Sequence, residues 1–81
     1  MSNAISENQA GTIKDNLHAY EANFETPFII YDSASKGFEV YRTQEEFRNG
    51  QGYVQFCYNI SYLDGWLYGA VQAKCKQIRS I

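Results

Sequence analysis

The clearest periodic pattern in the chain is an apolar stripe in its first third. Large apolar side chains recur at the spacing of one α-helical face, at Ile13, Leu17, Tyr20 and Phe24. Pro27 follows, and the residue before a proline avoids helical backbone angles. The pattern therefore predicts a helix over residues 13–23.

Three short segments further along have the pattern of β-strands. Residues 28–31 are a continuous apolar run, whereas residues 38–42 and residues 53–60 alternate with a period of two. A polar cluster joins the first two segments, and it ends in Gly37, a residue that tolerates positive φ. These features predict a β-hairpin followed later by a third strand.

Two further helices are predicted in the second half of the chain. Thr43 and Glu46 have the spacing of a capping box, and the glycines at 50 and 52 restrict that helix to about two turns. A long helix is expected to reach about residue 79, with a core stripe at Leu63, Leu67, Val71, Cys75 and Ile78. Small residues at 65, 69 and 73 predict close packing of this helix on the sheet, with a helix-mediated dimer as the alternative.

The order of these elements predicts an α+β fold. We expect a three-stranded antiparallel sheet with the two longer helices on one face, in the order α-β-β-(short α)-β-α. A chain of 81 residues allows one domain, which we place at residues 12–81. Residues 1–11 read as a flexible polar tail, and the sequence Ser-Asn-Ala at 2–4 also matches a remnant of an expression vector, an origin left open here.

Strand alternation assigns the side chains to two faces of the sheet. The face expected beneath the helices carries Phe28, Ile30, Phe38, Val40, Val54, Phe56 and Tyr58. The face expected to stay open carries Ile29, Tyr31, Glu39, Tyr41, Tyr53, Gln55 and Cys57. Three tyrosines on an open face suit a binding surface, because tyrosine offers rigid contact area with a polar tip. A simple preference of tyrosine for strands is the alternative explanation.

The leading hypothesis is a small, non-catalytic interaction or regulatory module that binds a protein partner or a second copy of itself. Small acidic proteins of this kind are common among inhibitors and accessory proteins of mobile elements. The expected partner-binding residues are the open-face tyrosines and the aromatic start of the last helix, namely Tyr31, Tyr41, Tyr53, Tyr62, Trp66 and Tyr68.

Charge provides the main alternative hypothesis. The net charge is −2, yet residues 65–81 contain Lys74, Lys76 and Arg79 and no acid. These three bases would serve a nucleic-acid-binding module, but an acidic chain lacks the strongly basic patch that such modules carry. The overall charge therefore disfavours nucleic-acid binding, which stays as the alternative hypothesis.

Catalysis, metals and membranes find little support in the sequence. Cys57 and Cys75 are the only cysteines, His18 is the only histidine, and no close-spaced Cys/His cluster exists, so we expect no metal and no cofactor. An enzyme of unknown type ranks only as the second alternative. The sequence does not indicate which residues would act as nucleophile, base and electrostatic stabiliser. Free thiols, the absence of a signal-peptide pattern at the start and the lack of a long apolar segment favour a cytoplasmic protein.

Overall fold

The computed structural model describes the backbone of residues 2–79 and the side chains of residues 5–76. The elements are β1 (Ser2–Ala4), α1 (Glu7–Asn23), β2 (Phe28–Asp32), β3 (Gly37–Tyr41), α2 (Gln44–Arg48), β4 (Gln55–Cys57) and α3 (Ile60–Arg79). The predicted α+β fold is confirmed, with its order of helix, strand, strand, short helix, strand and helix and with two helices longer than the third. A short additional strand, β1, precedes these elements.

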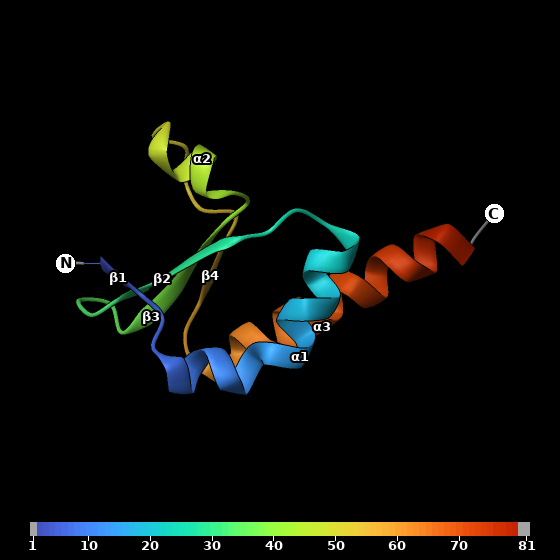
Figure 1. The fold of residues 1–81 in the computed structure, drawn as a ribbon, viewed down its shortest axis with the longest axis horizontal. Helices are drawn as coiled ribbons and strands as arrows, with labels where there is room; N and C mark the ends of the chain where they lie inside the picture. Colours follow the sequence, from blue (N-terminus) through green and yellow to red (C-terminus); the bar gives the residue numbers. More distant parts are fainter. Residues whose placement is uncertain (1, 80–81) are drawn as a thin grey trace.

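The sheet is antiparallel throughout, in the order β1-β2-β3-β4. The three predicted strands therefore lie side by side in sequence order, and β1 pairs with the outer edge of β2. Figure 1 shows α1 and α3 running beside each other on one side of the sheet, whereas α2 lies on the other side. At the opposite edge, the side-chain Nε2 of Gln55 donates to the carbonyl of Phe56 (2.9 Å), both in β4.

The structure corrects the predicted tail over residues 1–11. Its described part forms β1 and the first five residues of α1, which begins at Glu7 and not near residue 13. A capping box explains the early start, because Ser6 Oγ accepts from the Gln9 amide and Gln9 Oε1 accepts from the Ser6 amide. Ile5 also packs against the core. The first turns of α1 carry few apolar residues, so a search for hydrophobic periodicity overlooks them.

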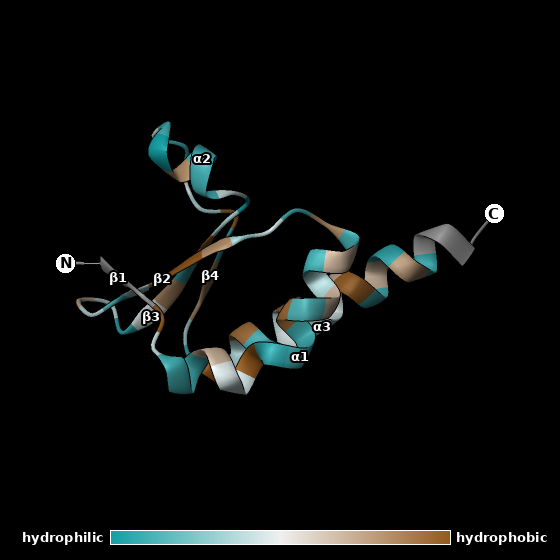
Figure 2. Ribbon diagram, in the orientation of Figure 1, coloured by the Kyte–Doolittle hydropathy of each residue, from teal (hydrophilic) through white to brown (hydrophobic). Residues whose placement is uncertain are grey.

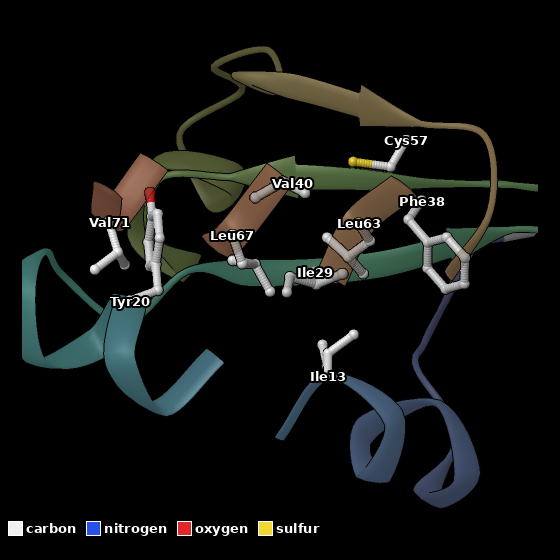
Figure 3. Packing of buried hydrophobic residues seen from close by; sticks show 9 residues of the cluster. All are labelled: Ile13, Tyr20, Ile29, Phe38, Val40, Cys57, Leu63, Leu67 and Val71. Atoms are coloured by element: carbon white, nitrogen blue, oxygen red, sulfur yellow. The ribbon is translucent and has the colours of Figure 1, made fainter. Parts of the chain in front are cut away.

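The hydrophobic core lies between the helix pair and the sheet. Figure 3 shows the side chains of α1 and α3 converging on those of β2, β3 and β4, and the cluster consists of Ile13, Tyr20, Ile29, Phe38, Val40, Cys57, Leu63, Leu67 and Val71. Figure 2 shows hydrophobic residues along β2 and α3, whereas α2 is largely hydrophilic. The predicted apolar stripes of both long helices thus supply core residues. Burial of such side chains stabilises a domain by roughly 1.5–3 kcal/mol each.

The small-residue line of α3 does not pack closely on anything. Gly65, Gly69 and Ala73 are exposed, and a Cβ atom placed on either glycine would meet no atom within 4 Å. The predicted close packing of this line on the sheet is therefore wrong. The core stripe of α3 faces the sheet and α1, which leaves the small residues on the solvent side.

Gly37 has a different role from the one expected. The positive φ in the β2–β3 turn belongs to Lys36 (58°), and Lys36 N donates to Asp32 O (2.7 Å). Gly37 is instead required by packing, because the ring of Phe56 lies over it. A Cβ atom at position 37 would come within 2.2 Å of Phe56 Cζ and 2.9 Å of the Cys57 carbonyl oxygen.

We expect Gly37→Ala to lower the free energy of unfolding by about 1–3 kcal/mol, because the ring of Phe56 must move to admit the methyl group. Urea denaturation measures the change. Gly69→Ala is the matched control, and it should leave stability unchanged or raise it by up to about 1 kcal/mol, because its site is open and lies in a helix. Equal effects of the two substitutions would contradict this account of Gly37.

Candidate interaction surface

The register between β2 and β3 decides which side chains the long helices cover. Ile29 pairs with Val40 and Tyr31 with Phe38, and directly paired residues lie on the same face of a sheet. All four pack in or against the hydrophobic core beneath α1 and α3. The alternate positions consequently point to the opposite side, which we call the open face. Its sheet positions with described side chains are Phe28, Ile30, Asp32, Gly37, Glu39, Tyr41 and Phe56.

The predicted division of the two faces is correct for β3 and reversed for β2 and β4. Ile29, Tyr31, Gln55 and Cys57 lie on the helix-covered side, and Phe28, Ile30 and Phe56 lie on the open face. Val54 and Tyr58, predicted to lie beneath helices, are 50% and 68% exposed. Every position of residues 28–31 is apolar, and both alternating sets of residues 53–60 contain large apolar side chains. Alternation therefore cannot choose between the faces, and pairing with β3 makes the choice.

Seven rings form a continuous row on the open face, which we call the aromatic row. Its members in order of contact are Phe28, Phe47, Tyr41, Tyr53, Phe56, Tyr58 and Tyr62. Successive ring centroids are 4.8–6.3 Å apart, the range of favourable aromatic pairs. The row starts on α2 and the beginning of β2, crosses β3 and β4, and ends in the first turn of α3.

Much of the aromatic row is accessible to another molecule. Tyr53, Tyr58 and Tyr62 are 49%, 68% and 42% exposed. Two other residues of this face, Ile30 and Tyr41, are buried, although neither belongs to the core cluster under the helices. Tyr41 is thus packed against two rings of the row, those of Phe47 and Tyr53, and not under a long helix.

Tyr41 links the aromatic row to a carboxylate. Its hydroxyl donates to Glu39 Oε1 at 2.8 Å. Burial and then the hydrogen bond to Glu39 raise the pKa of Tyr41 to about 12. Tyr41 therefore stays protonated at neutral pH and keeps one oxygen of Glu39 occupied.

The aromatic row includes only three of the six predicted partner-binding residues. Tyr41, Tyr53 and Tyr62 belong to it. Tyr31 instead packs on Phe38 on the helix-covered side (ring centroids 5.2 Å apart), and Trp66 packs against Tyr20 (5.7 Å) and the core. Tyr68 is 55% exposed but makes none of the ring contacts of the row.

Four members of the row were missed by sequence reasoning, namely Phe28, Phe47, Phe56 and Tyr58. Phe47 gave a usable signal, because it is the single large apolar residue of a short polar helix and must pack on something. The other three required the strand register.

Of the predicted basic residues, Lys74 contacts the end of α1 and not the aromatic row. Lys74 Nζ donates to the Asn23 carbonyl and lies 4.6 Å from the ring centroid of Phe24, so it ties α3 to the end of α1. The side chain of Arg79 lies outside the described residues. The charged sheet positions of the open face, within the part of the chain that the structure describes, are the acids Asp32 and Glu39.

A pocket of about 380 Å³ lies at the end of α1, away from the aromatic row. Its lining residues are Tyr20, Asn23, Phe24, Glu25, Arg42 and Lys74. Arg42 forms ion pairs with Glu46 and Glu25, and Lys74 is held by Asn23. The charges of the pocket are thus largely satisfied by the chain itself.

We expect the thiol of Cys57 to resist alkylation at pH 7.5, because burial raises its pKa to about 11 and leaves little thiolate. Cys75 is partly exposed and should react first. A thiol-reactive chromophore resolves the two rates, and the variant Cys75→Ser isolates the slow one. Equal rates for the two thiols in the folded protein would contradict the burial of Cys57.

We also expect Tyr41 to make the fold sensitive to alkali. Because its pKa is raised on folding, its contribution to stability is complete below about pH 10 and is lost as the pH rises toward 12. The free energy of unfolding should therefore fall more steeply above pH 10 in the wild type than in Tyr41→Phe. Parallel pH profiles of the two proteins would show that folding does not raise the pKa of Tyr41.

Features of other functional classes are not found among the described residues. No three of their His, Cys, Asp and Glu side chains gather into a metal site, and none of their helices is long and apolar enough to cross a bilayer. Family models, curated proteins and solved structures gave no match to this chain.

Proposed function

We propose that this protein is a non-catalytic interaction module that binds a partner protein through its aromatic row. The observation that carries the proposal is the unbroken chain of ring contacts across a sheet face that neither long helix covers. Exposed aromatic clusters of this kind are enriched at the centres of protein interfaces.

The aromatic row is well suited to binding because its rings already support one another. Tyr53 contacts Tyr41 on one side and Phe56 on the other, and Tyr58 lies between Phe56 and Tyr62. Each ring has few torsions to immobilise, so little conformational entropy is lost when a partner binds. The hydroxyl groups of the three exposed tyrosines can form hydrogen bonds at the rim of the interface.

Other observations support a binding role over a catalytic one. The pKa of Cys57 is raised and its side chain is fully buried, which removes it as a nucleophile. His18 is exposed on α1, and it is not part of any metal-binding group among the described residues. Both cysteines are free thiols, which is consistent with a reducing compartment such as the cytoplasm.

We expect Tyr53→Ser and Tyr62→Ser to weaken capture of a partner protein from native lysate by at least tenfold, because truncation of a central aromatic anchor commonly costs more than 1–2 kcal/mol. Tyr68→Ser is the matched control, because Tyr68 is at least as exposed but lies outside the row, and it should leave capture unchanged. Quantitative mass spectrometry of the captured proteins measures the effect.

Light scattering completes the test by identifying self-association. A dimer that dissociates in Tyr53→Ser but persists in Tyr68→Ser would identify the partner as a second copy of the chain. Capture that is equally strong for wild type, Tyr53→Ser and Tyr62→Ser, while circular dichroism confirms folding, would exclude the aromatic row as the binding surface.

A further inference from the structure

We infer that the aromatic row recognises cationic side chains, arginine or lysine, on the partner protein. This inference rests on the proposed function and names the chemistry of the surface that the row would bind. It follows from two independent features of the open face, namely the acidity of its sheet positions and the accessibility of its rings. Both attract a positive charge, and neither attracts a negative one.

The acidity of the open face comes from its strand register. Asp32 and Glu39 both fall on this face, and no described sheet position there carries a base. Asp32 lies at the end of β2 and accepts hydrogen bonds from Ala34 N and Ser35 Oγ in the turn. Glu39 lies in the middle of β3, directly opposite Phe56 of the aromatic row. A charge complementary to this face is therefore positive.

Glu39 is the carboxylate best placed to bind a cation. Its Oε1 accepts a hydrogen bond from the Tyr41 hydroxyl. The two oxygens of a carboxylate can accept further hydrogen bonds from other donors. The side chain is half-buried beside aromatic rings, where reduced solvent screening strengthens an ion pair relative to open water. An arginine that reaches Glu39 would also lie against the rings of the row.

The exposed rings add a second source of attraction for cations. The face of a tyrosine ring carries negative electrostatic potential, and a guanidinium or ammonium group within about 6 Å of the ring centroid is stabilised. Tyr53 and Tyr58 are the most exposed rings that lie near Glu39 along the row. The chain uses the same chemistry internally, where Lys74 lies over the ring of Phe24.

The two arginines that follow members of the row in sequence do not lie on the strands of this site. Arg42 directly follows β3, but its guanidinium is paired with Glu46 and Glu25 at the pocket by the end of α1. Arg48 is in the last turn of α2, at the Phe47 end of the row, where it favours the helix dipole. Among the described basic side chains these are the two nearest to the row in sequence, and neither lies on β3 or β4 between Glu39 and Tyr58.

The same geometry disfavours a single-stranded nucleic acid. Its bases would need ring faces on which they could stack, together with cations that follow the phosphates. Two neighbouring pairs of the row are instead nearly perpendicular, at 84° for Tyr41 and Tyr53 and 81° for Phe56 and Tyr58, so these rings offer no parallel platform for successive bases. The charged sheet positions beside them are acidic, so the phosphates would be repelled.

A pair of peptides tests the inference directly. The probe is acetyl-Gly-Arg-Gly-Arg-Gly-amide, and its control carries citrulline, a neutral isostere, in place of each arginine. In ¹⁵N–¹H NMR titrations of the full chain, we expect the arginine peptide to shift the amide signals of Glu39, Tyr53 and Tyr58. The citrulline peptide should give no comparable shift up to 10 mM.

Substitutions identify which groups bind the cation. Glu39→Gln keeps an acceptor for Tyr41 and should weaken the arginine peptide about threefold to tenfold, whereas Glu21→Gln, an exposed acid on α1, should change nothing. Tyr58→Leu removes a ring face but keeps apolar area, and it should weaken binding about twofold to fivefold. Tyr68→Leu is its matched control.

Several results would overturn the inference. These are equal binding of the two peptides, no shift with the arginine peptide at 10 mM, or a tighter complex between the row and a single-stranded oligonucleotide. Partner capture also separates this inference from the proposed function. If capture depends on Tyr53 but is insensitive to Glu39→Gln and to salt, the interaction module stands and cation recognition fails. If capture ignores Tyr53 as well, both fail.

Discussion

The structure depends most on the pairing of β2 with β3. That register places Ile29 beside Val40 and Tyr31 beside Phe38, which gives the helix pair an apolar surface to cover. The same pairing determines the other side of the sheet. Because residues alternate strictly between faces, a shift by one residue would bring Glu39 and Tyr41 under the helices and turn part of the core to solvent. The core and the aromatic row are thus two consequences of one alignment of strands.

The two faces of the sheet are covered in different ways. On one side, α1 and α3 bury a conventional aliphatic core. On the other side, the described residues form no third long helix, and the rings of Phe47 and Tyr53 pack against Tyr41 instead. Large flat side chains bury much area per residue, which suits an 81-residue chain. The aromatic rings that shield part of this face from water also form a surface that another molecule can cover.

The sequence predicted the fold well because its signals were unambiguous at the level of elements. Helical stripes, strand alternation and the Thr43 cap each specify local structure, and every predicted element was found, although α1 begins at Glu7 and not near residue 13. The candidate surface was predicted only in part, because its composition depends on nonlocal pairing. Residues 28–31 are apolar at every position, so Tyr31 could be assigned to the open face although it lies on the covered one. Phe28 and Phe56 were missed for the same reason.

The hydrogen bond from Gln55 to the carbonyl of Phe56 has a consequence for how the protein meets its neighbours. β4 is the last strand of the sheet. The outer edge of such a strand ordinarily has unpaired backbone groups, which can pair with the backbone of another chain. An amide from the same strand already donates to this carbonyl, and the strand is only three residues long. A very short edge strand is a poor template for pairing with another chain. Selectivity for a binding partner then comes from side chains, which can distinguish one partner from another in a way that main-chain pairing cannot.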